Sequence, residues 1–347
     1  MAIKSSKTNN RQEKNQAQED RIISSQEKVT DKTIDNSLRP KFLDDYVGQS
    51  SIKKHLDVSI KSAQIRAQCL GHILFYGPPG LGKTTLSQII SNEMGSNIKI
   101  TSGPAVEKQA DLVSLLTNLE QGDVLFIDEI HRLRPQIEEI LYTAMEDFNI
   151  DIMVGKGTGA TSVRMDLPEF TLIGATTRLS SLSAPLRDRF GNVLKLDFYN
   201  SSELSEIILK NAKKLEVPLT DKTAENIAKR SRGTPRIANR LLKIIRDYFT
   251  IGKDISNEEI LNNIFCDLNI DDLGLDSLDK QYLENIYYKF AGGPVGLNTL
   301  ASAIGEEEDT IEDVVEPYLL QIGFLERTPR GRKITESGIA QIINNNK

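Results

Sequence analysis

The chain has 347 residues, of which 39% are hydrophobic and 27% charged, and its formal net charge at pH 7 is −6. This length allows two or three domains, and the composition is typical of a globular protein. The apolar runs are too short for a membrane helix and the polar N-terminus lacks a signal-peptide core, so we expect a cytoplasmic protein without membrane contact. The acidic balance argues against a globally basic nucleic-acid coat but allows one local basic patch.

Cysteine and histidine usage does not point to a metal centre held by side chains alone. Cys69 and Cys266 are far apart and belong to no zinc or redox spacing, and the three histidines form no ligand motif. We expect both thiols to be buried and reduced. Any metal ion should arrive with a nucleotide.

Composition and periodicity divide the chain into four parts. Residues 1–38 are polar and without period, which is typical of a disordered tail. Residues 39–198 alternate apolar strands with helical stretches and predict an α/β domain with a parallel, helix-covered sheet. Residues 199–272 show helical apolar spacing alone, which predicts a small helical domain with helices at Ser202–Leu215, Asp221–Arg232 and Pro235–Phe249. Residues 273–347 predict helices followed by a hairpin, as in a winged-helix module.

The first predicted strand, His72–Tyr76, runs into a phosphate-binding motif. Gly77–Thr84 fits the pattern GxxxxGK[ST], and the helical stretch Thr85–Met94 follows it. Glycines such as Gly80 and Gly82 let the backbone turn its N–H groups toward phosphate oxygens, and the helix adds its positive end. The flanking strand and helix are the context that this motif requires, so a chance glycine-rich turn is a poor alternative.

Two side chains of this motif have predicted roles in binding ATP and Mg²⁺. Lys83 should contact the outer phosphates. The Thr84 hydroxyl should bind the Mg²⁺ that bridges the β- and γ-phosphates.

A second predicted strand, Val124–Ile127, ends in the adjacent acids Asp128 and Glu129. Ligands of such sheets bind at the carboxyl ends of the strands. Asp128 would hold Mg²⁺, and Glu129 would orient or deprotonate the attacking water. A solvated acidic strand end is the alternative, and the phosphate loop weakens it.

A third predicted strand, Thr171–Ala175, is followed by Thr176, Thr177 and Arg178, and the segment LRDRFG comes shortly afterwards. An arginine delivered to the γ-phosphate from a neighbouring subunit would couple hydrolysis to assembly. We assign this role to Arg189. From the residues alone, a surface salt bridge is an equally compatible interpretation.

Residues 150–169 predict a hairpin, because three glycines separate two β-prone segments. We expect its apolar pair Ile152 and Met153 to be exposed, which would suit a docking contact. An ordinary edge hairpin is the alternative.

The C-terminal module separates acidic from basic residues. The predicted third helix, Thr310–Leu320, is acidic and would be repelled by a phosphate-lined groove. The basic residues come later, in the predicted wing, at Arg327, Arg330, Arg332 and Lys333. We expect this wing to contact DNA phosphates rather than base edges, although a solvated charged loop has the same composition.

Together these motifs resemble the AAA+ superfamily and, within it, the RuvB family of Holliday-junction branch-migration motors. The resemblance rests on GPPGLGKTT, LFIDEIHRL, GATTR, LRDRFG, RGTPR and RTPRGR, along with LRP and GQ before the phosphate loop. It implies an AAA+ P-loop domain with a parallel sheet, a helical lid and a C-terminal winged-helix domain. One departure is Glu308, an acid near a position where the family can carry a basic residue.

The resemblance also implies site residues. Arg189 matches the family's arginine finger, Arg236 its second sensor, and either Thr176 or Thr177 its first sensor. Arg327 and Arg332 match its DNA-contacting positions most directly. Further implied nucleotide contacts are Leu38, Arg39, Thr85, Glu146, Asp147, Phe148 and Tyr199.

The implied function is that of a motor in recombination and repair. Six subunits would encircle duplex DNA at a Holliday junction, hydrolyse ATP with Mg²⁺, meet RuvA through the hairpin at residues 150–169 and act with RuvC. A clamp loader would need another DNA element in place of the RTPRGR segment. A regulator that uses ATP only as a switch would not need Glu129, and a protein-remodelling ATPase would not need a winged helix.

Overall fold

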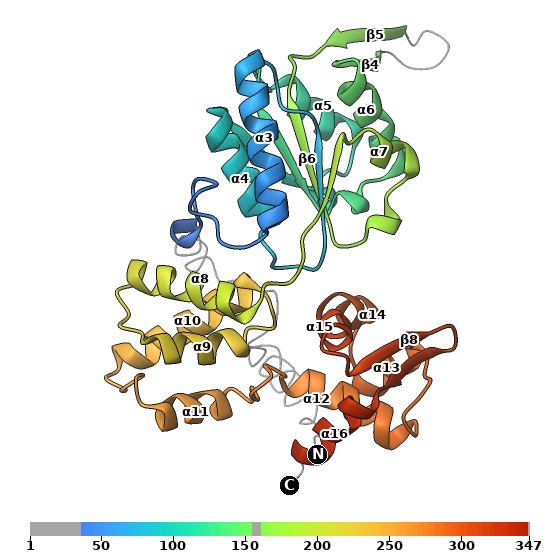
Figure 1. The fold of residues 1–347 in the computed structure, drawn as a ribbon. Coiled ribbons are helices and arrows are strands. Elements are labelled where there is room, and N and C mark those ends of the chain that lie inside the picture. The colour runs from blue at the N-terminus through green and yellow to red at the C-terminus, as the bar shows by residue number, and fades with distance from the viewer. Residues whose placement is uncertain (1–35, 155–160, 346–347) are drawn as a thin grey trace, which may run out of the picture.

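The computed structural model describes residues 36–154 and 161–345, arranged in three parts (Figure 1). An α/β domain lies at the top of the view, a helical bundle below it on one side, and a winged-helix module on the other. The described chain begins with a helical turn at 36–38, and Leu38 is 2% exposed. Leu38, which the sequence analysis placed at the end of the tail, therefore packs into the described structure. No helix of the described ranges is long and apolar enough to cross a membrane.

The α/β domain is built on a five-stranded parallel sheet with the order β2-β3-β6-β1-β7. Its strands are β1 (Ile73–Tyr76), β2 (Ile98–Ser102), β3 (Val124–Asp128), β6 (Thr171–Thr176) and β7 (Asn192–Lys195). The predicted strands correspond to β1, β3 and β6, the three inner strands, which are buried as parallel strands usually are. Strands β2 and β7 were not predicted. They form the two edges of the sheet: most residues of β2 are half-buried, and in β7 half-buried and exposed residues alternate.

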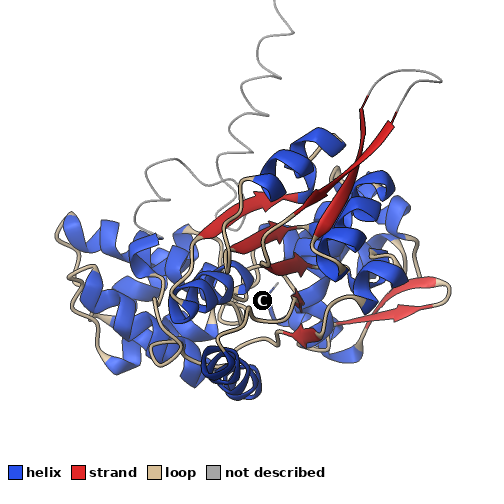
Figure 2. Cartoon of the chain, turned by 90° about the horizontal axis from the view of Figure 1, so that it is seen from above, coloured by secondary structure: helices blue, strands red, loops and turns tan. Residues whose placement is uncertain are grey.

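Helices cover both faces of this sheet (Figure 2). Side chains of β1 alternate, so Ile73 and Phe75 join one apolar cluster and Leu74 joins the other. Helices α3 (Ser50–Arg66) and α4 (Lys83–Met94) pack into the first cluster, and α5 (Gln109–Thr117) and α6 (Pro135–Glu146) into the second. Short helices complete the domain: η1 (Gly103–Ala105), η2 (Ile130–Arg132), η4 (Leu179–Ser181) and α7 (Ala184–Asp188).

A hairpin of β4 (Asn149–Val154) and β5 (Thr161–Asp166) projects from the domain on the side away from the winged-helix module (Figure 1). Ile152 was expected to be exposed, but it is half-buried and packs against the domain core. Met153 and the predicted glycine tip are outside the part whose side chains the structure describes. Among the side chains of this hairpin that the structure describes, Val163 and Met165 are exposed and apolar.

The helical bundle contains four helices, α8 (Ser201–Lys214), α9 (Asp221–Lys229), α10 (Pro235–Thr250) and α11 (Glu258–Asp267). The first three match the predicted helices. The fourth was not predicted, although Asn257 caps its first turn and Leu261, Ile264 and Phe265 have the helical spacing of a buried face. Cys266 at its end is exposed and Cys69 is partly so, which contradicts the expectation that both thiols are buried.

The winged-helix module consists of α12 (Ser277–Glu284), η5 (Asn285–Lys289), α13 (Leu297–Ile304), α14 (Glu308–Thr310), η6 (Ile311–Val315), α15 (Glu316–Gln321), β8 (Leu325–Thr328), β9 (Gly331–Ile334) and α16 (Glu336–Asn345). The antiparallel pair β8–β9 forms the wing. At the start of β9, Gly331 has a φ of 132°, and a Cβ there would collide with the carbonyl of Val295. Only glycine lets the wing lie this close to the module.

A buried ion pair joins the helical bundle to the winged-helix module. Arg232, before α10, lies 2.8 Å from Asp279 of α12, and their side chains are 3% and 0% exposed. Arg232 also donates to the carbonyl of Val314 at 3.1 Å, and its guanidinium stacks over the ring of Tyr318. Because these contacts cross the junction, the two parts should move as one body.

Replacing Asp279 with Ala should lower the free energy of unfolding by about 3–5 kcal/mol, because Arg232 would be left as an unpaired buried charge. Urea unfolding followed by circular dichroism measures this change. Asp276→Ala, which removes only the N-cap of α12, is the matched control and should cost about 1 kcal/mol. Equal losses of unfolding free energy in the two variants would contradict a stabilising role of the Arg232–Asp279 pair.

Candidate functional site

The segment Gly77–Thr84 forms a loop between β1 and α4 that glycine alone can adopt. Gly77 has a φ of 139°, Gly80 of 81° and Gly82 of 100°. A Cβ at Gly77 would lie 2.5 Å from the carbonyl oxygen of Leu196. The loop therefore presents backbone to its interior and leads directly into the N-terminus of α4, where N–H groups favour an anion.

The ammonium group of Lys83 is buried inside this loop with neutral partners. Its Nζ donates to the carbonyl oxygens of Gly77 at 2.8 Å and Pro78 at 2.9 Å, and the residue is only 8% exposed. Burial lowers the pKa of Lys83 to about 8; Asp128 opposes this shift and Arg236 adds to it. A buried cation among neutral acceptors at a helix N-terminus fits a nucleotide phosphate.

Two tyrosines hold the loop from the lid side. The hydroxyls of Tyr46 and Tyr199 lie 2.7 Å apart, and both are within hydrogen-bond distance of the Leu81 carbonyl, at 3.4 and 3.3 Å. Burial raises the pKa of Tyr199 to about 12, so its hydroxyl keeps its proton near neutral pH. The backbone N–H of Arg236 donates to Gly80 at 3.4 Å. Thus Tyr199 and Arg236, both named from the sequence, border the loop.

Tyr46 was not identified in the sequence analysis. It lies in an irregular segment before α3, where no helical or strand period distinguishes it. Its position between two recognised motifs, LRP and GQ, was the only available signal. Its role depends on a contact with Tyr199, which is 153 positions away in the chain.

The acidic end of β3 lies at the same edge of the sheet as the phosphate loop, because all five strands are parallel. Glu129 has a φ of 47°, and its N–H donates to the Asp128 carboxylate at 2.9 Å. The Glu129 carboxylate faces outward and pairs with Arg132 at 3.2 Å. Asp128 and the Thr84 hydroxyl supply oxygen donors of the kind that Mg²⁺ takes along with phosphate oxygens.

The structure distinguishes the two candidate threonines at the end of β6. Thr176 is 1% exposed, and its hydroxyl lies 3.0 Å from His131 Nδ1. The same hydroxyl accepts the N–H of Arg178 at 3.0 Å. Thr176 is therefore committed to internal contacts, whereas Thr177 is half-buried at the edge of the sheet.

Leu38, Arg39 and Thr85 lie around α4. The Leu38 carbonyl accepts Lys214 Nζ of α8 at 3.0 Å, and Arg39 donates to Gln88 of α4 at 3.4 Å. Thr85 is half-buried in the first turn of α4. These residues therefore border the junction between the phosphate loop and the lid.

Glu146, Asp147 and Phe148 do not lie at the phosphate loop of their own subunit, contrary to the simplest interpretation of the resemblance. The Phe148 ring packs against His72 and Phe170, which precede β1 and β6 at the amino edge of the sheet. The phosphate loop lies at the carboxyl edge, and a four-residue strand such as β1 spans about 13 Å. These three residues cannot line the same intrasubunit pocket.

Arg189 lies on this same distant edge. Its Nη2 pairs with Glu146 at 2.6 Å, and its guanidinium lies 5.4 Å from the centre of the Tyr142 ring. Its buried Nε has no hydrogen-bond partner among the described residues. The side chain is 33% exposed, so it is accessible from outside the subunit but remote from its own Lys83.

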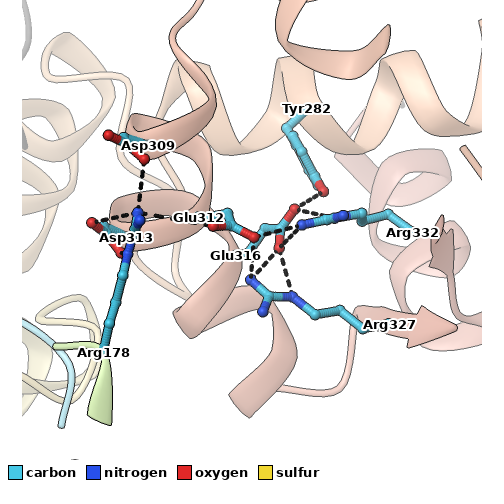
Figure 3. A network of polar contacts seen from close by, with 8 residues as sticks. All are labelled: Arg178, Tyr282, Asp309, Glu312, Asp313, Glu316, Arg327 and Arg332. Atoms are coloured by element: carbon cyan, nitrogen blue, oxygen red, sulfur yellow. Dashed lines mark hydrogen bonds and ion pairs between the residues drawn. The ribbon is translucent and has the colours of Figure 1, made fainter. Parts of the chain in front are cut away.

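Two of the expected DNA-contacting arginines, Arg327 and Arg332, are paired with acidic residues of the third helix, which is the continuous run α14–η6–α15 (Figure 3). Arg332 donates to Glu316 at 2.8 Å and to Glu312 at 2.9 Å, and Arg327 donates to Glu316 at 2.8 Å. Arg330, at the tip of the wing, is exposed. The wing's basic cluster is thus partly neutralised by the helix whose acidity the sequence analysis had interpreted only as a barrier to DNA.

A phosphate loop, an acidic strand end on a five-stranded parallel sheet, and a helical lid that closes over the loop define an ATPase of the AAA+ class. Models of three RuvB domains match this chain: the Holliday junction DNA helicase RuvB P-loop domain at residues 38–196, the RuvB AAA lid domain at 199–271 and the RuvB C-terminal winged helix domain at 272–343. The chain belongs to the RuvB family.

Individual relatives agree with this membership. A curated protein of Dehalococcoides mccartyi (strain CBDB1), the Holliday junction branch migration complex subunit RuvB, is 56% identical over 319 residues, covering 92% of this chain and 91% of the relative. A solved structure of the Thermotoga maritima RuvB Holliday junction branch migration motor is 51% identical with a TM-score of 0.81, covering 88% of this chain and 98% of that one. The solved structure of a point mutant of that protein is 52% identical with a TM-score of 0.82, again covering 88% of this chain and 98% of that one.

Nucleotide binding should take up protons above about pH 8. Burial lowers the pKa of Lys83 to about 8, and a bound phosphate anion would raise it again. ATP affinity should therefore fall as pH rises from 8 to about 10. Calorimetric titration at pH 8.5 in buffers of different ionisation enthalpy measures the proton uptake.

The control for this titration is Glu129→Gln, which should bind ATP with the same proton uptake because Glu129 does not contact the Lys83 ammonium. A pH-independent affinity between 8 and 10 would contradict the predicted linkage.

Proposed function

We propose that this chain is one subunit of an ATP-driven ring that moves Holliday junctions along DNA. The observation that carries the proposal is that a complete phosphate loop, lid and DNA-type wing occur in one chain that matches a branch migration subunit over 91% of that relative's length. A clamp-loader ATPase is disfavoured, because the match extends through the winged-helix domain at residues 272–343.

Within a subunit, we assign the binding of ATP and Mg²⁺ to the carboxyl edge of the sheet. Lys83 compensates the phosphate charge, and Thr84 and Asp128 would hold the metal ion. Glu129 orients the attacking water and accepts its proton once Arg132 releases its carboxylate. Thr177 is the proposed first sensor, because the Thr176 hydroxyl is already bonded to His131.

We further propose that the other half of each site comes from a neighbouring subunit. Arg189 and the Glu146–Phe148 segment lie together on the edge opposite Lys83, so a head-to-tail arrangement brings them to the next subunit's nucleotide. Arg236 of the lid would sense the γ-phosphate from within. Repetition of this contact closes a homo-hexamer around the duplex.

The proposed partners follow from the surfaces that remain. Arg327, Arg330 and Arg332 of the wing would contact DNA phosphates without reading bases. The hairpin of β4 and β5, with exposed Val163 and Met165, is the proposed contact with RuvA, and RuvC is the proposed third component. We propose domain limits at 39–198, 199–272 and 273–347, with the first extended to include Leu38.

Arg189→Ala should lower ATP turnover by about 10³-fold or more while leaving ATP affinity within a few-fold, because an arginine finger acts on transition-state charge. Arg187→Ala is the matched control, since Arg187 lies two positions away and makes only a 3.9 Å contact with Asp188. Turnover is measured by phosphate release and affinity by a fluorescent nucleotide.

A mixture of Arg189→Ala and Lys83→Ala subunits provides a sharper version of this test. If Arg189 acts on the neighbour's nucleotide, some interfaces combine an intact Lys83 with an intact Arg189, and turnover should partly return. A mixture no more active than its components would place Arg189 in its own subunit's site.

Purified protein with RuvA should dissociate a synthetic four-way junction only when ATP is present. Lys83→Ala and Glu129→Gln should both abolish dissociation, the first by weakening binding and the second by preventing hydrolysis. Junction dissociation is followed by native gel electrophoresis. ATP turnover with no junction dissociation would overturn the proposed substrate and return the chain to the broader class of DNA-associated ATPases.

A further inference from the structure

A cluster of seven charged side chains connects the end of strand β6 to the wing (Figure 3). Arg178 comes from the α/β domain, Asp309, Glu312, Asp313 and Glu316 from the third helix of the winged-helix module, and Arg327 and Arg332 from the wing. The cluster contains four carboxylates and three guanidinium groups. The positive charge of Arg327 and Arg332 is therefore already compensated before any DNA phosphate arrives.

On one side, the cluster holds the segment that follows the proposed sensor. Arg178 makes a two-pronged contact with Asp313 at 3.1 and 3.0 Å and reaches Asp309 at 2.9 Å. Its backbone N–H is bonded to the hydroxyl of Thr176 at 3.0 Å. Any shift of this segment with the nucleotide state would therefore be felt at the third helix.

On the other side, Glu316 of α15 holds the two wing arginines. Its side chain is fully buried, and its oxygens accept from Arg327, Arg332 and Tyr282, each at 2.8 Å. If a DNA phosphate bound one of these arginines, Glu316 would still accept hydrogen bonds from its other donors. Glu316 is therefore a fixed anchor for the wing.

Glu312 differs because it lies between the two groups of arginines. One carboxylate oxygen is 2.9 Å from Arg332 and 3.9 Å from Arg327, and the other is 3.8 Å from Arg178. The Glu312 side chain is 32% exposed. The residue lies in η6, a π-helical turn of a kind that recurs at functional sites. The single negative charge of Glu312 cannot fully neutralise Arg178 and the wing arginines at the same time.

We propose that Glu312 is a positioning residue that couples DNA binding at the wing to the nucleotide-sensing end of β6. A backbone phosphate competes with Glu312 for Arg332 and Arg327, and the released carboxylate then pairs with Arg178. DNA on the wing and a tight Arg178 contact thus favour each other, and the coupling is reciprocal. This inference rests on the proposed function, because it requires the wing to bind DNA phosphates.

The first measurement is the affinity for a random-sequence duplex, by fluorescence anisotropy without nucleotide. Glu312→Gln should bind about three- to tenfold more tightly than the wild type, because the wing loses a competing carboxylate, and the gain should shrink at high salt. Arg178→Gln should bind more weakly, since Glu312 is then left to the wing alone. Asp309→Asn is the matched control: it contacts Arg178 but not the wing, so its affinity should stay near that of the wild type.

The second measurement is the stimulation of ATP turnover by saturating duplex. Glu312→Gln should lose this stimulation despite its tighter binding, a combination that simple loss of structure would not produce. Arg178→Lys, which keeps the charge but not the two-pronged geometry, should retain part of it. The double variant Arg178→Gln/Glu312→Gln should be no more impaired in stimulation than either single variant, because both changes break one path.

Three outcomes would overturn the inference: unchanged or weaker duplex binding by Glu312→Gln, wild-type stimulation in that variant, or additive effects in the double variant. Thermal unfolding of each variant identifies misfolded protein, and Arg178→Gln tests the same path from the other domain if Glu312→Gln fails to fold. A wild type that does not bind duplex would overturn the proposed function and this inference together. A wild type that binds duplex but gives additive variants would overturn the inference alone.

Discussion

The buried ammonium of Lys83, held by neutral carbonyl oxygens, is the interaction on which the rest of the site depends. Burial lowers the pKa of the Lys83 ammonium, Asp128 opposes the shift only in part, and an anion entering the loop would compensate the charge further. The loop can enclose it only because Gly77, Gly80 and Gly82 adopt backbone conformations that other residues avoid. Tyr46 and Tyr199 then connect the loop to the lid, so the loop is bonded to the place where the two domains meet.

The parallel sheet divides the remaining machinery between its two edges. Lys83, Asp128 and Glu129 lie at the carboxyl edge, whereas Arg189 and Phe148 lie at the amino edge. A rigid sheet cannot bring its two edges together, so these groups can serve one reaction only across a subunit boundary. The geometry of a single chain thereby supports the proposed ring, in which hydrolysis requires a neighbour.

Movement can reach the wing by two routes of different physical character. The buried pair of Arg232 and Asp279 joins the lid to the winged-helix module, and its fully desolvated geometry makes it costly to break. The cluster around Glu312 is partly exposed, and exposed ion pairs are individually weak. A strong buried ion pair beside weak, exchangeable ones would allow the lid and the winged-helix module to move together. The contact of the module with the end of β6 could change during this movement.

Local sequence determined a large share of this protein. The phosphate loop, the acidic strand end, the three inner strands and the first three helices of the lid follow from spacing and glycine placement, because those signals act within a few residues. Edge strands β2 and β7 were missed because half-exposed strands carry a weaker apolar signal. Tertiary structure alone decided that Tyr46 meets Tyr199, that Phe148 lies far from Lys83, and that Glu312 lies between Arg178 and Arg332. Each of these contacts or separations involves residues that are distant in the chain. The sequence shows what a charged group or a hydroxyl can bind, but only the packing of the chain decides which partner lies next to it.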